Sequence, residues 1–99
     1  MNDVCLSLLA APELEEKLLD RLLLNPVINT FASQMAASHG GHLTELDPGE
    51  QVLGRGDAVL IHVVLAAENV DDVLTDLRRG FTGSRLRYWL CPVLLQGEL

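Results

Sequence analysis

The segment DVCLSLLAAPELEEKLLDRLL, residues 3–23, decides the fold because its pattern changes once, at Pro12. Residues 3–10 form a short apolar run rich in Val and Leu, which is typical of a buried strand. After the proline, which suits a first helical turn, leucines recur at helical spacing and charged residues take the other side. These leucines are Leu14, Leu18, Leu19, Leu22 and Leu23. The segment therefore predicts a strand and then a helix, which Asn25-Pro26 ends.

The rest of the chain repeats this order around a polar segment. Residues 27–36 alternate in the manner of a strand, and the stripe of Val70, Val73, Leu74 and Leu77 predicts a second helix. The expected elements are a strand over 27–36, a long mobile loop over 38–51, a strand over 52–67 that is strongest over 58–65, a helix that Asn69 caps and that ends before Gly80, a turn over 81–84 and a strand over 85–95.

Two strand-helix-strand halves predict a single domain over residues 1–99 with the ferredoxin-like βαββαβ fold. In this α+β fold, two helices cover one face of a four-stranded antiparallel sheet. Nothing else in the chain is left to cover the other face. Because these strands are apolar, we expect another subunit to cover it, and Trp89 or its neighbour Tyr88 to lie on it.

Composition excludes several classes of function. Seven Lys and Arg against fourteen Asp and Glu give a net charge of −7, which disfavours binding to nucleic acid or to anionic membranes. The longest apolar run, residues 59–67, is too short to span a bilayer. The N-terminal residues lack the basic segment of a signal peptide, so we expect a cytoplasmic protein with reduced thiols.

The motif His39-Gly40-Gly41-His42 is a candidate metal site. Imidazoles bind Zn, Cu, Ni or Co, and the glycines between them let both rings turn toward one ion. A closed site needs further ligands, which Glu45, Asp47 or a neighbouring subunit would supply. The alternative is a solvated loop with two incidental histidines.

Two Arg-Gly segments are candidate anion sites. Gly54-Arg55-Gly56 and Arg78-Arg79-Gly80 combine permissive backbone with guanidinium groups, a pairing that recognises phosphate or carboxylate. Both have ordinary alternatives, because glycines make turns and basic residues stabilise the C-terminus of a helix.

The two cysteines and His62 form a third group. In the expected sheet the first and fourth strands are neighbours, so Cys5 and Cys91 can lie close together on one face, with His62 beside them. Packing is the favoured explanation, because buried free cysteine is a common small hydrophobe. The sequence contains none of the motifs of nucleophilic or metal-dependent catalysis, so we expect no enzyme activity.

Several short motifs resemble a small PII-like family without a settled biochemical function. They are the Pro-x-Leu-Glu-Glu that follows the first strand, Asn29-Thr30-Phe31 before the loop, Gly54-Arg55-Gly56 after it, and Tyr88-Trp89-x-x-Pro92-Val93 near the end. The resemblance implies a homotrimer related to the PII proteins, which sense adenine nucleotides and small metabolites. It also implies that the loop over 38–51 contacts a partner protein, such as a metal-efflux transporter.

The resemblance further implies a ligand site at the base of the loop and at the turn after the second helix. That site would comprise Gly54, Arg55, Gly56, Gly80, Thr82, Gly83, Ser84 and Arg85. The turn is shorter than in true PII proteins, so a smaller nucleotide than ATP, or none, is expected. The resulting hypothesis is a regulatory binding protein; the alternatives are a domain that binds small molecules of the amino-acid type and a metal-tolerance protein without a signalling role.

Overall fold

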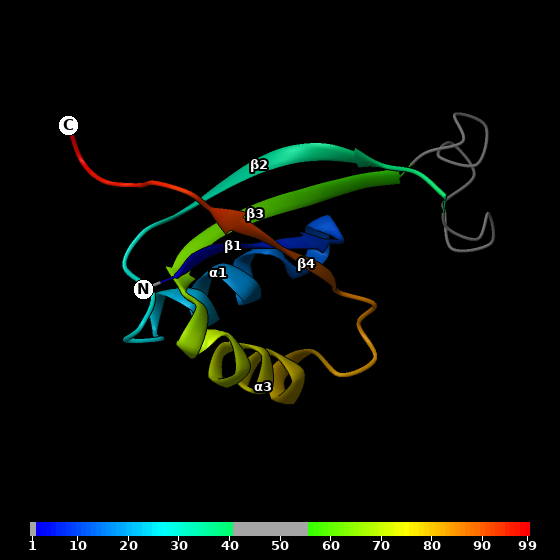
Figure 1. Cartoon of the computed structure of the whole chain (residues 1–99). Helices are drawn as coiled ribbons and strands as arrows, with labels where there is room; N and C mark the ends of the chain where they lie inside the picture. Colours follow the sequence, from blue (N-terminus) through cyan, green and yellow to red (C-terminus); the bar gives the residue numbers. More distant parts are fainter. Residues whose placement is uncertain (1, 41–55) are drawn as a thin grey trace.

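The computed structural model describes residues 2–40 and 56–99. Its elements are β1 (Asp3–Ala10), a short 3-10 turn η1 (Pro12–Leu14), α1 (Glu15–Leu23), β2 (Phe31–Ser38), β3 (Gly56–Ala66), a second 3-10 turn η3 (Ala67–Asn69), α3 (Val70–Phe81) and β4 (Arg87–Val93). The four strands form one antiparallel sheet in the order β2-β3-β1-β4, and both helices lie on the same side of it (Figure 1). The predicted ferredoxin-like βαββαβ fold is confirmed.

The core lies between the helices and one face of the sheet. Alternate strand residues, among them Leu6, Leu8, Ile61 and Val63, are buried against both helices. The helices contribute Leu18, Leu22, Val73, Leu74, Leu77 and Phe81. This side of the sheet is called the helix face below.

The other side of the sheet, called the open face, carries no helix. The residues of β1 and β4 that alternate with the core residues point there, and Trp89 and Cys91 of β4 are exposed. Val64 of β3 is 37% exposed and Trp89 is 42% exposed. Of the two adjacent aromatics, Trp89 is therefore the one on the uncovered face, whereas Tyr88 lies opposite the core residue Leu8. Both neighbours were candidates, and the strand register chooses between them.

β2 begins four residues later than predicted, at Phe31 instead of residue 27. The Asn25 side chain accepts a hydrogen bond from the amide of Val27, and its carbonyl accepts one from the amide of Ile28. These bonds fold the chain into a turn, so residues 27–30 do not enter the sheet.

The second helix differs from the prediction at both ends. Asn69 is the last residue of η3 and stands just before α3, but its side chain makes no capping hydrogen bond, because its backbone is already helical. At the other end, Gly80 lies inside α3 and not after it. A Cβ atom on Gly80 would stand 3.2 Å from a guanidinium nitrogen of Arg21, so the glycine allows α1 to approach α3 closely.

The remaining bounds differ at the ends of the last two strands. β4 is shorter than predicted, running from Arg87 to Val93, and β3 begins at Gly56 in the part of the chain that the structure describes. β4 is an edge strand that contains Pro92. The predicted loop over 38–51 falls mostly outside the described residues; Ser38 itself ends β2. Neither helix of the described residues has the length and apolarity that a bilayer crossing requires.

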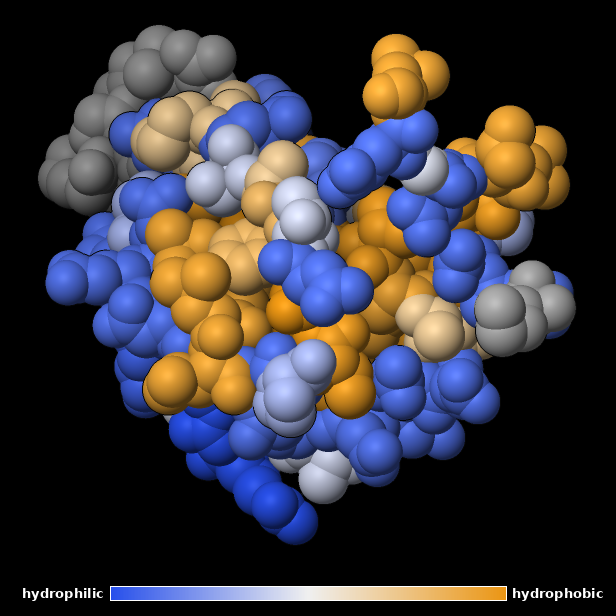
Figure 2. Space-filling model, turned by 90° about the vertical axis from the view of Figure 1, so that its left-hand side faces the viewer, coloured by the Kyte–Doolittle hydropathy of each residue, from blue (hydrophilic) through white to orange (hydrophobic). Residues whose placement is uncertain are grey.

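Apolar residues also reach the surface at the end of the molecule where both chain termini lie. The end of α1 and the connection to β2 expose Leu23, Leu24 and Val27, and the C-terminal segment exposes Leu94 and Leu95. Figure 2, which looks at this end, shows hydrophobic side chains gathered between hydrophilic ones. Exposed apolar surface is therefore not confined to the open face.

Candidate functional site

A hollow of about 360 Å³ lies between the C-terminal half of α3 and the start of β4. It is called the α3–β4 hollow below. One wall is apolar and consists of Leu8, Leu74, Leu77, Phe81, Leu86 and Tyr88. Polar groups are contributed by Arg78 and by the connection between the two elements, through Thr82, Gly83 and Arg85. Its volume and its mixture of apolar wall and few polar groups are those of small-molecule sites.

The connection between α3 and β4 is shaped by hydrogen bonds to the last turn of the helix. The Thr82 hydroxyl donates to the Arg78 carbonyl, and the Ser84 amide and hydroxyl both donate to the Phe81 carbonyl, the amide at 3.1 Å. Gly83 has a φ of 78°, a conformation that favours glycine, and Arg85 has a φ of 61°. The turn therefore folds back against α3 and brings Arg85 to the same hollow as Arg78.

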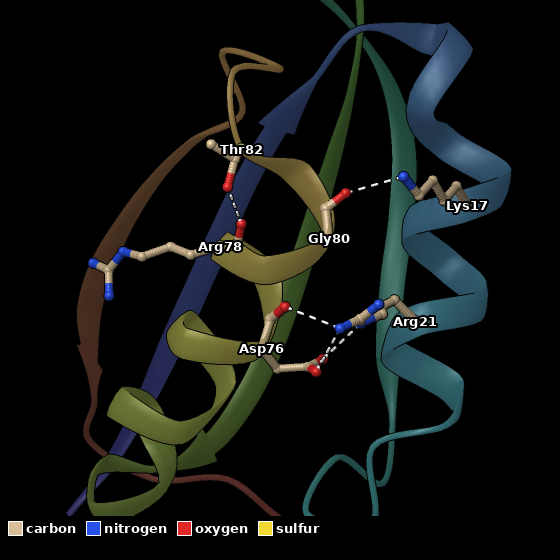
Figure 3. Close-up of polar contacts among 6 residues, drawn as sticks. All are labelled: Lys17, Arg21, Asp76, Arg78, Gly80 and Thr82. Carbon is tan, nitrogen blue, oxygen red and sulfur yellow. Dashed lines mark hydrogen bonds and ion pairs between the residues drawn. The ribbon is translucent and has the colours of Figure 1, made fainter.

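Positive charge is concentrated in the segment that runs from the end of α3 to the start of β4, although the chain as a whole is acidic. Four of the seven Lys and Arg residues, Arg78, Arg79, Arg85 and Arg87, lie within ten consecutive residues that contain no Asp or Glu. The Arg78 side chain extends from α3 on the side away from α1, and its guanidinium makes no hydrogen bond or ion pair with a described residue (Figure 3). An anion at the hollow would therefore meet unneutralised positive charge at Arg78.

Contacts with α1 hold the opposite side of α3. Arg21 binds Asp76 through two nitrogen–oxygen pairs, at 2.9 and 3.0 Å, and Lys17 donates to the Gly80 carbonyl at 3.0 Å (Figure 3). The hydrogen bond from Arg21 lowers the pKa of Asp76, against a weaker opposing effect of burial. The Lys17 ammonium also lies 5.0 Å from the centre of the Phe81 ring. These contacts fix the end of α3 from which the turn and Arg78 project.

A second hollow, of about 320 Å³, lies beside this contact and is lined by Arg21, Leu24, Asn25, Pro26 and Asp76. Its two charged side chains are paired with each other. It therefore offers an incoming ion much less than the α3–β4 hollow does.

A model of the protein family described as "Protein of unknown function (DUF3240)" matches residues 1–99. The chain belongs to this family. No curated protein matches the sequence. A crystal structure of a DUF3240 family protein from Shewanella baltica has a TM-score of 0.83 and 17% identity, with 100% of this chain and 98% of that chain covered.

The DUF3240 chain also has PII-like structural neighbours. CPII of Thiomonas intermedia, a nitrogen regulatory PII-like protein bound to ADP, AMP and bicarbonate, has a TM-score of 0.74 and 13% identity, covering 100% of this chain and 98% of that chain. GlnK of B. subtilis in its ATP complex has a TM-score of 0.69 and 16% identity, covering 93% and 82%. The resemblance to a PII-like family of unknown function is therefore confirmed, and at these identities the likeness concerns the fold.

The predicted ligand residues fall into three groups in this DUF3240 chain. Thr82, Gly83 and Arg85 line the hollow, and Ser84 lies in the same turn. Gly80 faces α1 from within the helix and does not line the hollow. Gly56 is the buried first residue of β3, opposite Ser38, while Gly54 and Arg55 lie outside the described residues. Whether Arg55 joins the turn in one site stays a prediction.

The predicted metal pair is described in part. His39 follows β2 and is exposed, whereas His42 lies outside the described residues. Within residues 2–40 and 56–99, no three His, Cys, Asp or Glu side chains are grouped so that they could hold a metal ion. The metal site at His39 and His42 stays a prediction.

Sequence reasoning missed the apolar wall of the hollow. Leu86 was expected only as a strand residue and Tyr88 as one of two candidates for the uncovered face. Their side of β4 becomes clear only from the register that pairs Tyr88 with Leu8. Arg78 was predicted as part of a candidate anion site, with stabilisation of the helix end as the alternative, but not as a residue of the same site as Arg85. The signal that could have joined them is the absence of acidic residues between Leu77 and Gly97.

Proposed function

We propose that this chain is a non-catalytic, PII-like regulatory protein that binds a small anionic ligand at the α3–β4 hollow. The observation that carries the proposal is the convergence of Arg78 and Arg85 on one hollow beside the turn that ends α3. Guanidinium groups bind phosphate and carboxylate through paired, charge-assisted hydrogen bonds. Structural neighbours bind ADP, AMP and bicarbonate in one case and ATP in another, which supports an adenine nucleotide as the first ligand to test.

The proposal includes assembly as a homotrimer through the open face. PII proteins, which the sequence resembles, are homotrimers, and this face leaves apolar residues such as Trp89 and Val64 in contact with water. A closed symmetric assembly covers such a face in every copy at once. The loop over 38–51 would then be the surface that contacts a partner protein.

Calorimetric titration with AMP, ADP, ATP and bicarbonate tests the ligand. We expect at least one of them to bind below millimolar concentration. Arg78→Gln should raise its Kd by roughly tenfold or more, because a hydrogen bond to a charged group contributes about 1.5–3 kcal/mol. Arg79→Gln is the matched control, since Arg79 carries the same charge on the same helix but does not line the hollow.

Two results would overturn the ligand proposal. One is the absence of binding by all four compounds below millimolar concentration. The other is an equal loss of affinity in the Arg78→Gln and Arg79→Gln variants, which would indicate a general charge effect without a site.

A further inference from the structure

The two cysteines of the chain are direct cross-strand partners. Cys5 of β1 is paired with Cys91 of β4 in the antiparallel register. Directly opposite residues in such a pair have Cα atoms about 4.5–5.5 Å apart, within the range of about 4.4–6.8 Å that disulfides span. Both side chains point to the open face, because their sequence neighbours Leu6 and Leu90 are paired with each other on the helix side of the register. A bond between the two sulfur atoms therefore requires no change of register.

The two thiols differ in their access to solvent. Cys91 is exposed on the edge strand, whereas Cys5 on the inner strand is half-buried. An oxidant therefore reaches Cys91 first. Cys5 is then the nearest second thiol and is held in place by the strand pairing.

A chain of polar groups leads away from Cys5 across the open face. The Cys5 sulfur lies 3.9 Å from the Ser7 hydroxyl, which lies 3.1 Å from Nδ1 of His62 on β3. Ser7 is only 3% exposed although most of its neighbours are apolar. When the thiol donates to Ser7 and Ser7 donates to the imidazole, the proton of Cys5 has a route to His62, and the thiolate that remains is the nucleophilic form.

We propose that Cys5 and Cys91 form a reversible oxidation site at which a hydroperoxide closes an intramolecular disulfide. The Cys91 thiolate attacks one peroxide oxygen, breaks the oxygen–oxygen bond and becomes a sulfenic acid, while the other oxygen leaves as hydroxide or alkoxide and is protonated. The Cys5 thiolate then attacks the Cys91 sulfur, forms the disulfide and displaces hydroxide, which leaves as water. Two thiols are oxidised and one hydroperoxide is reduced. A dithiol then reduces the disulfide to the two thiols by exchange and is itself oxidised.

This site does not depend on the proposed ligand. It lies on the face that we propose is covered in the trimer, so assembly would shield Cys91 and the unassembled chain would be the reactive form. Substitution of the neighbouring Trp89 by Asp should open the face without removing either thiol.

The test treats the reduced full chain with hydrogen peroxide, blocks remaining thiols by alkylation and maps the peptides by mass spectrometry. The wild type and the Trp89→Asp variant are compared. We expect a peptide that links Cys5 to Cys91, an intact mass lower by two hydrogen atoms, and recovery of both thiols with dithiothreitol. If the disulfide forms in the Trp89→Asp variant at least as fast as in the wild type, the result supports an oxidation site made of Cys5 and Cys91. Independent oxidation of the two thiols, or disulfides between chains, in both proteins would overturn it.

Three further variants separate the two steps. Cys5→Ser should leave Cys91 as the sulfenic acid, and Cys91→Ser should prevent the disulfide. Ser7→Ala, which keeps nearly the same volume, should slow disulfide closure several-fold and leave the rate of sulfenic acid formation at Cys91 unchanged. Equal effects of Ser7→Ala on both steps, or no effect on either, would remove the route through His62.

Discussion

The two faces of the sheet are made by the same strands but have different surroundings. On the helix face, Leu8 and Ile61 are buried by two helices. Their immediate neighbours in sequence, Leu9 and Leu60, point the other way and remain half-exposed. Because adjacent residues have similar apolar character, the difference comes from what covers each face and not from the strands themselves. The single chain therefore packs helices against one face of its sheet and leaves the other face without a covering layer.

Alanine substitutions at two adjacent residues give the largest expected contrast. Ile61→Ala should lower the free energy of unfolding by about 2–5 kcal/mol, because it leaves a cavity in the core. Leu60→Ala should cost less in the unassembled chain, since part of that side chain is already in water. Urea unfolding monitored by circular dichroism, in the Trp89→Asp background, measures both. Equal losses would show that the open face is as tightly packed as the helix face.

Charge substitutions at Trp89 and Tyr88 test whether other subunits cover the open face. Trp89→Asp places a carboxylate on the open face and should convert the proposed trimer to monomers of about 10.8 kDa, because burying an unpaired charge is costly. Tyr88→Asp places the same charge beside the hollow and should leave the subunit number unchanged. Native mass spectrometry at micromolar concentration reports both, and a wild-type monomer under these conditions would overturn the assembly proposal.

The ion pair between the two helices gives the smallest expected effect. Arg21 lowers the pKa of Asp76 below its ordinary value of 3.8, so the pair stabilises the fold above that pH. The contribution should be lost as the pH falls through the lowered pKa of the folded state. Asp76→Asn should remove it at all pH values, with a small loss at pH 7 because both side chains are 36% exposed. Unfolding curves at pH 7 and in acid, for wild type and variant, should differ more at pH 7.

The parts of the fold that repeat a simple period could be predicted from the sequence. β1 has the predicted bounds, and the strand order follows from the two strand-helix-strand halves, which also places Cys5 beside Cys91. The start of β2 could not be predicted, because the Asn25 side chain competes for the backbone there. Gly80 was predicted to follow the second helix but lies inside it. A glycine fits there because Arg21, a residue far away in sequence, approaches closely.

Only the part of the candidate site that lies within one short segment was predicted from the sequence. The composition of residues 81–84 predicts a turn, and the resemblance to the PII-like family implied that Thr82, Gly83 and Arg85 belong to a ligand site there. The apolar wall draws on β1, α3 and β4, and its composition depends on register and helix placement, which no short segment encodes. The histidine pair and Arg55 include residues outside the described part of the chain, and they stay predictions.

Pro92 bears on whether copies of the chain can join without limit. A sheet edge accepts a further strand through its free amide and carbonyl groups, and this is how exposed strands nucleate fibres. β4 forms one such edge, and at Pro92 it has no amide hydrogen to offer. A strand added along β4 would therefore meet a break in the ladder, which favours a closed assembly over an open-ended polymer. One imino acid thus protects the protein from insolubility while leaving the wide surface of the sheet free for specific association.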